Sequence, residues 1–248
     1  MARYFIEVSY KGTRYSGFQV QDNAITIQAV VEKALQVFYK QTIALTGSSR
    51  TDAGVHALQN FFHFDTDINI VPDRLYNINA ILPSDVVIKN IYPVKDDAHS
   101  RFLATSREYK YFIYQHKDPF LEDRAWFYPF KLDIKLLQEA AKIVTTYKDF
   151  TSFSKRNTQV NNFFCNIEKS QWLEAESGIV YNVQANRFLR GMVRGLVGTM
   201  LRVGRGVLTL DGFKQIIEAK DCAKADFTTP PHGLFLVSVY YPSDTFIK

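Results

Sequence analysis

The sequence predicts an α/β protein of the α+β type, in which a mixed, mostly antiparallel sheet is backed by helices. Strand-like and helix-like stretches alternate along the 248 residues, and several consecutive strand-like stretches are close enough to pair as hairpins. No linker or low-complexity segment interrupts the chain. We therefore expect two architecturally similar subdomains, at residues 1–104 and 105–248, that share one sheet with a cleft between them.

The first half is predicted to begin with a strand at residues 3–10, which is apolar on much of both faces. A polar loop with two glycines follows at residues 11–21. Thr26 is suited to cap a helix whose apolar stripe continues to Phe38. The other elements expected in this half are strands at 42–46, 60–65 and 86–92 and a short helix at 72–80.

The second half repeats the alternation of strands and helices without a sequence repeat. The elements expected here are strands at 107–115, 163–173, 179–183 and 234–240, an irregular stretch at 119–129, a turn at 149–153, and helices at 134–147, 187–203 and 209–219.

The helix predicted at 187–203 has an unusual polar face. Arginines share this face with Gly191, Gly195 and Gly198, while apolar residues occupy the other side. A solvated basic face is the ordinary meaning of such a pattern. Each glycine in a helix costs about 0.8–1 kcal/mol relative to alanine, however. We therefore expect another backbone or a phosphate-bearing ligand to approach this face closely.

Composition limits the classes of protein that need to be considered. The net charge of +5 favours a polyanionic partner only weakly, and the aromatic content of 15% supplies rings for burial and stacking. Cys165 and Cys222 are far apart and lack metal-ligand spacing, so neither a disulfide framework nor a zinc site is expected. No apolar stretch reaches membrane-spanning length and the N-terminus lacks the layout of a signal peptide, which favours a cytoplasmic protein.

The chain is organised around residues 45–64, where a polar loop joins two strand-like runs. Asp52 lies in this loop between Gly47 and Gly54, two residues after Arg50. An aspartate beside an arginine is commonly a helix cap or part of a surface ion pair. Loops on a rigid scaffold are also where catalytic groups are commonly displayed. These residues alone leave both interpretations open.

Six blocks of sequence, taken together, are more specific than this loop alone. SRTDAGVHA, at residues 49–57, resembles the signature of the TruA family of tRNA pseudouridine synthases. The other blocks resemble further motifs of that family and occur in its order: KGTRYSGFQVQ with TIQAVVEKAL, HSRFLATSREYKY, DFTSF, ANRFLRGMVRGLVGTMLRVG and PPHGLFLVSVYYP. The resemblance extends over nearly the whole chain.

The resemblance implies an RNA-modifying enzyme. Members of the family isomerise uridine to pseudouridine at positions 38, 39 and 40 of the tRNA anticodon stem-loop, and they use no cofactor or metal. The implied architecture is the pseudouridine synthase fold, with two RRM-like subdomains that flank a central cleft. Bacterial members are homodimers, so tRNA and a second copy of the chain are the expected partners.

The resemblance also assigns roles to individual residues. The nucleophilic aspartate of the family corresponds to Asp52. The tyrosine that stacks on the target base corresponds to Tyr109, and the arginine that pairs with the catalytic carboxylate corresponds to Arg194. Arg50 resembles the residue that helps to flip the target nucleotide out of its stack. Arg101 is expected to contact RNA or to support the site.

Three residues depart from the family pattern. Ser49 stands where glycine is usual, Lys11 replaces an aspartate, and Phe18 replaces a tryptophan. None of these changes affects the residues matched to the nucleophile, the stacking tyrosine or the paired arginine. His56 and His63 are separated by seven positions across a turn, which does not make a metal site, and we interpret both as structural histidines.

Two other functions compete with catalysis. A non-catalytic RNA-binding module could use two RRM-like halves with aromatic strands and basic loops. However, a binding surface for phosphate gains nothing from a carboxylate such as Asp52. A phosphate-binding hydrolase could use the turn at 47–49, but this turn lacks the lysine of a P-loop and the chain lacks a metal-ligand cluster.

Overall fold

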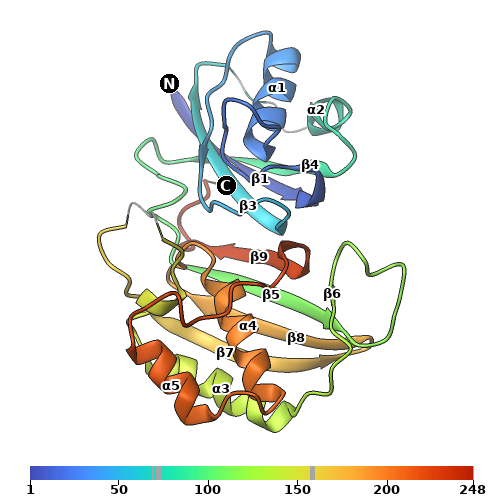
Figure 1. The fold of residues 1–248 in the computed structure, drawn as a ribbon. Helices are drawn as coiled ribbons and strands as arrows, with labels where there is room; N and C mark the ends of the chain where they lie inside the picture. The colour runs from blue at the N-terminus through green and yellow to red at the C-terminus, as the bar shows by residue number, and fades with distance from the viewer. Residues whose placement is uncertain (69, 71–73, 157–159, 248) are drawn as a thin grey trace. The chain divides into compact units, whose positions relative to one another are not determined.

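The computed structural model describes residues 1–68, 70, 74–156 and 160–247. The chain forms two compact units, which consist of residues 1–105 with 236–248 and of residues 106–235 (Figure 1). Both units combine strands and helices, and the long strand pairs within them are antiparallel. The predicted α+β class is confirmed.

The described part of the first unit contains a small sheet and the helices α1 and α2. Its strands are arranged in the order β4-β1-β3, β2 pairs with β3, and the part of β9 that belongs to this unit lies next to β3. Thr26 caps α1 as expected, because its hydroxyl accepts a hydrogen bond from the backbone N–H of Ala29. The elements are β1 (Ala2–Tyr10), the 3₁₀ turn η1 (Gly12–Arg14), α1 (Ile27–Tyr39), β2 (Thr46–Gly47), β3 (His56–Thr66), α2 (Leu75–Asn79), β4 (Val86–Val94) and the end of β9 (Leu234–Tyr240).

The strand predicted at 42–46 is wrong, since β2 contains only Thr46 and Gly47. The backbone of Leu45 finds its partners on α1 instead of on a neighbouring strand. Its N–H donates to the Glu32 carboxylate at 2.9 Å, and its carbonyl accepts from the Gln28 amide at 2.8 Å. The start of the helix predicted at 72–80 falls outside the described residues, and α2 itself begins at Leu75.

Both faces of the first sheet are covered, which explains why β1 and β3 are apolar on both sides. On one face Phe5 and Phe61 contact Tyr241 near the C-terminus, with ring centroids 5.4 and 5.2 Å apart. On the opposite face, to which the next residue of β3 points, the Phe18 ring stacks on the Phe62 ring with centroids 4.5 Å apart. Tyr241 therefore packs against the core of the first unit.

The described part of the second unit contains a sheet against which the helices α3, α4 and α5 pack as one group. The strands are arranged in the order β5-β8-β7, the short β6 pairs in parallel with β5, and α3 contacts both β7 and α4 (Figure 1). The elements are β5 (Ser106–Tyr114), β6 (Trp126–Phe127), α3 (Ile134–Thr146), the 3₁₀ turn η3 (Thr151–Phe153), β7 (Ile167–Ala175), β8 (Gly178–Ala185), α4 (Met192–Gly204), α5 (Leu210–Glu218) and the 3₁₀ turn η4 (Pro231–Gly233).

The helix predicted at 187–203 starts five residues later than expected, at Met192. Gly191 has a φ of +74°, a left-handed conformation that does not continue into a helix in the N-terminal direction. Arg187 and Arg190 therefore precede α4 instead of lying on its polar face. Among the described residues, no helix is long and apolar enough to cross a lipid bilayer.

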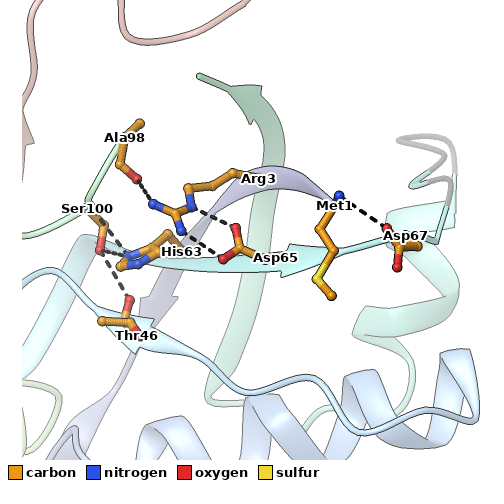
Figure 2. A network of polar contacts seen from close by, with 8 residues as sticks. All are labelled: Met1, Arg3, Thr46, His63, Asp65, Asp67, Ala98 and Ser100. Atoms are coloured by element: carbon orange, nitrogen blue, oxygen red, sulfur yellow. Dashed lines mark hydrogen bonds and ion pairs between the residues drawn. The ribbon is translucent and has the colours of Figure 1, made fainter. Parts of the chain in front are cut away.

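A polar network ties residues 98–100 to the first sheet (Figure 2). The Arg3 guanidinium donates to both carboxylate oxygens of Asp65 at 2.7 Å and to the carbonyl of Ala98 at 3.1 Å. Nδ1 of His63 lies 2.9 Å from the Ser100 hydroxyl, which also donates to the Thr46 carbonyl at 3.2 Å. The loop before β5 is thus fixed to β1, β2 and β3 by side chains.

The buried His63 predicts a pH-dependent stability. Burial, followed by the charges of His99 and Arg3, lowers the pKa of His63 from 6.5 to about 4. In the unfolded chain the His63 imidazole becomes protonated near pH 6.5, whereas in the folded chain it does so only near pH 4. The free energy of unfolding should therefore decrease as pH falls from 6.5 towards 4. Chemical unfolding of His63→Gln should show a shallower decrease over this range than the wild type does. Equal slopes in the two proteins would contradict the assignment.

Candidate active site

Asp52 lies in the loop between β2 and β3 and is half-buried. Its carbonyl accepts a hydrogen bond from the N–H of Val55 at 3.1 Å, which closes a turn. Gly54 has a φ of +78°, a left-handed conformation that glycine adopts without strain. The turn therefore gives the aspartate a defined place immediately before β3.

Buried side chains hold the loop from beneath. The Asn60 amide donates to the Ser49 carbonyl at 2.8 Å and to the Tyr10 hydroxyl at 3.2 Å, and its oxygen accepts from the N–H of Phe61 at 2.9 Å. The Tyr10 hydroxyl lies 2.8 Å from the Thr51 hydroxyl. Asn60 is fully buried, so these bonds form away from water, where an unmade one would be costly.

The segment at residues 11–18 supports the same loop from the side. The Gly12 N–H donates to Nδ1 of His56 at 3.0 Å, and the Phe18 N–H donates to the Thr51 carbonyl at 3.1 Å. A Cβ on Gly12 would lie 2.0 Å from the Val55 carbonyl oxygen, so this close approach requires glycine. The two sequence blocks that resembled separate family motifs are thus one packed structure.

The departures from the family pattern have distinct structural settings. Phe18 packs between Phe62 and Gly47, which accounts for an apolar ring at this position. Lys11 is exposed, and its backbone N–H donates to the backbone carbonyl of Asp85. Ser49 is buried, and in the part of the chain that the structure describes its hydroxyl has no hydrogen-bond partner.

Arg50 and Arg101 are both exposed residues of the first unit. Arg50 lies in the same loop as Asp52, two positions earlier. Arg101 follows the anchored Ser100, and its guanidinium carbon lies 5.6 Å from the centre of the Phe102 ring. Both cations are therefore placed at the surface by segments that are fixed beneath.

Tyr109 is in β5 of the second unit and is 8% exposed. It pairs with Val183 of β8, and its ring meets the Phe188 ring edge to face at 5.0 Å. Tyr111 follows two positions later on the same face of β5, because side chains alternate along a strand. Burial raises the pKa of Tyr111, and the charge of Arg194 opposes this shift.

Arg194 is in the first turn of α4 and is half-buried. Its Nε donates to the Thr229 carbonyl at 2.7 Å, while the Thr229 hydroxyl donates back to the Arg194 carbonyl at 2.9 Å. The Tyr111 hydroxyl donates to the next carbonyl, that of Pro230, at 2.8 Å. The guanidinium is therefore held near the face of β5 that carries Tyr109 and Tyr111.

Another backbone covers the glycine-rich face of α4, which decides between the two alternatives that the sequence left open. A Cβ on Gly198 would lie 2.5 Å from the Asp226 carbonyl oxygen and 2.6 Å from the Thr229 hydroxyl. A Cβ on Gly195 would meet the Phe227 ring at 2.8 Å. The glycines thus admit the segment 226–229, which in turn binds Arg194.

His56 and His63 have the structural roles that were predicted. Both are buried, His56 accepts the N–H of Gly12, and His63 is bound to Ser100. Among the described residues, no three or more histidine, cysteine, aspartate or glutamate side chains are grouped so that they could hold a metal ion.

The candidate residues are divided between the two units. The first unit carries Arg50, Asp52 and Arg101, and the second carries Tyr109 and Arg194. The sequence analysis did not identify Asn60 and Tyr10, whose side chains hold the loop that carries Asp52. Asn60 could have been recognised, because it is a polar residue in an otherwise aromatic strand, where it is buried.

Comparison with known proteins relates both units to one family. A family model described as tRNA pseudouridine synthase matches residues 6–102 and 140–242, which include the candidate residues other than Tyr109. A tRNA pseudouridine synthase A of Parabacteroides distasonis is 44% identical over 249 residues, with 99% of this chain and 98% of the relative covered.

More distant relatives agree. A protein of the same name from Porphyromonas gingivalis is 43% identical over 252 residues, with both chains fully covered. A third, from Staphylococcus carnosus, is 36% identical over 241 residues, with 96% of this chain and 90% of the relative covered. These alignments extend over nearly the entire chain.

Removing the Asn60 amide should damage the loop without preventing RNA binding. In Asn60→Leu the Ser49 carbonyl and the Phe61 N–H lose their partner, which should lower the free energy of unfolding by about 1–3 kcal/mol. Turnover should fall at least about tenfold, since small displacements of reacting groups have large effects on rate. Asn77→Leu, at an exposed position of α2 in the same unit, is the matched control and should behave as the wild type in both measurements.

Filling the glycine face of α4 should destabilise the second unit. Gly198→Ala drives a methyl group into the Asp226 carbonyl, which should lower the free energy of unfolding by about 1–3 kcal/mol despite the gain in helix propensity. In α5, a Cβ on Gly212 would meet chiefly the end of the Leu208 side chain, which can move. Gly212→Ala should therefore be neutral or stabilising. Equal effects of the two substitutions would refute the covering role of residues 226–229.

Proposed function

Since this chain belongs to the tRNA pseudouridine synthase family, we propose that it isomerises uridine at positions 38, 39 and 40 of the tRNA anticodon stem-loop, with Asp52 as the nucleophile. The protein is an isomerase that forms pseudouridine in tRNA. The finer proposal concerns which uridines it modifies and which residues carry out the reaction.

The observation that supports this proposal best is the setting of Asp52. The loop that carries this carboxylate is fixed by buried hydrogen bonds from Asn60 and Tyr10, in a protein with a net charge of +5. A surface that only bound RNA phosphates would be weakened by a carboxylate at such a position. A rigidly mounted aspartate fits a reacting group better than a binding group.

The reaction breaks the bond between C1′ of the ribose and N1 of the uracil, and forms a bond between C1′ and C5. The uracil rotates between these events, C5 loses its proton and N1 gains one, so that the product is an isomer of the substrate. Asp52 would act either by forming a covalent bond that divides the step in two or as the base that removes a ribose proton to give a glycal.

The other candidate residues would bind and orient the target nucleotide. Tyr109 would stack on the uracil, and its hydroxyl could move a proton. Arg194 would pair with Asp52 and keep the carboxylate ionised and oriented. Arg50 would help to extrude the nucleotide from its stack, which costs a few kcal/mol, and Arg101 would contact the RNA.

The partners expected for this activity are tRNA and a second copy of the chain. We propose a cytoplasmic homodimer that requires no metal or cofactor. A stem-loop is large compared with one unit of this protein, so a second subunit would provide additional basic surface for it. Sedimentation equilibrium at micromolar concentration tests this assembly.

Release of tritium tests the catalytic role of Asp52. With tRNA labelled at C5 of uracil, the wild type should release the label, because C5 loses its hydrogen when it bonds to C1′. Asp52→Asn should abolish release while it leaves the affinity for tRNA largely intact. Asp211→Asn, in the exposed ion pair with Lys214 in α5, serves as the control for loss of a carboxylate and should keep releasing the label.

Two outcomes would count against this assignment. Turnover near the wild-type rate in Asp52→Asn would remove Asp52 from the nucleophile's role. Tight, salt-dependent binding of tRNA without any release by the wild type would favour the alternative, a non-catalytic RNA-binding module.

A further inference from the structure

Phe102 is one of the most exposed aromatic side chains of the described structure, with 75% of its surface accessible. It follows a residue with the opposite property, since Ser100 is fully buried. The turn at 99–103 is closed by a hydrogen bond from the Leu103 N–H to the His99 carbonyl at 3.0 Å. The ring therefore projects from a defined turn.

The turn is anchored to the first unit at several points (Figure 2). The Ser100 N–H and hydroxyl both lie within hydrogen-bond distance of His63, and the Ser100 hydroxyl donates to the Thr46 carbonyl. Arg3 binds the Ala98 carbonyl just before the turn. Phe102 is thus held at the surface by an anchored turn, with most of its ring exposed to solvent.

Tyr241 connects this turn to the loop that carries Asp52. Its hydroxyl donates to the Ser100 carbonyl at 2.6 Å and lies 3.0 Å from the Ser48 hydroxyl. Thr46 and Ser48 belong to the chain that leads into that loop, and both are bound to the turn through these contacts. The exposed ring and the candidate nucleophile are therefore supported by one hydrogen-bond network.

The surroundings of Phe102 suit a nucleotide. The Arg101 guanidinium carbon lies 5.6 Å from its ring centre, and the His99 ring lies 4.3 Å away at an angle of 38°. Burial lowers the pKa of His99, which favours the neutral form of this ring. Because the Arg101 guanidinium lies over the Phe102 ring, the two planar groups together offer a base a stacking surface and its phosphate a positive charge.

We propose that Phe102 and Arg101 form a ledge on which an unpaired RNA base beside the target uridine stacks. The inference rests on the proposed function for the identity of the RNA. Stacking on this ledge would hold the neighbouring base while the target nucleotide leaves its stack, and the Arg101 guanidinium would bind the adjoining phosphate. Because stacking uses the face of the ring, the ledge would accept any of the four bases.

The test uses four variants of the full-length protein and C5-tritiated tRNA. Phe102→Ala and Phe102→Leu should each lower kcat/KM about 5- to 100-fold, which is the effect expected when one stacked base is lost. Phe102→Tyr, which keeps an aromatic ring, should retain the kcat/KM of the wild type. Phe120→Ala is the matched control, because Phe120 is 77% exposed in the second unit, and its kcat/KM should stay within about twofold of the wild type.

Several results would contradict the proposal that a base stacks on Phe102. Full activity of Phe102→Leu would show that apolar bulk suffices and that no base stacks there. Conversion of a dimer into a monomer by Phe102→Ala, seen in sedimentation, would assign the ring to a contact with a second copy of the chain. If the wild type releases no tritium, the proposed function fails. The affinity for tRNA of Phe102→Leu relative to the wild type then still decides whether the ledge exists.

Discussion

The hydrogen bond from the Asn60 amide to the Ser49 carbonyl is the constraint on which the candidate site depends. Asn60 projects from β3 into the interior, and the same side chain also binds the Tyr10 hydroxyl, which in turn contacts Thr51. These groups are buried, so breaking the hydrogen bonds that hold the loop between β2 and β3 would be costly. The place of Asp52 thus follows from residues of two core strands.

In the second unit, Arg194 is held in place by contacts of a different kind. In α4 the small size of Gly195 and Gly198 lets the segment 226–229 lie directly on the helix. Thr229 of that segment binds both the side chain and the carbonyl of Arg194. Each unit therefore holds one charged candidate residue in place through contacts of its own.

Local signals explain what the sequence alone could predict. Strand alternation, the Thr26 cap and the ordered motifs identified the fold class and the family, and the match to family motifs nominated Asp52, Tyr109 and Arg194. The supposed strand at 42–46 was wrong because α1 side chains bind the backbone of Leu45, and α4 starts late because of the conformation of Gly191. Tertiary contacts of this kind, like those of Asn60, join residues that are distant in sequence.

Mapping pseudouridine at single-base resolution in tRNA from cells that lack this protein tests the central claim most directly. The account predicts that pseudouridine disappears at positions 38, 39 and 40 of the anticodon stem-loop. Expression of the wild-type chain should restore it, whereas expression of Asp52→Asn should not. Persistence of pseudouridine at those positions in the deficient cells, or its restoration by Asp52→Asn, would contradict the account.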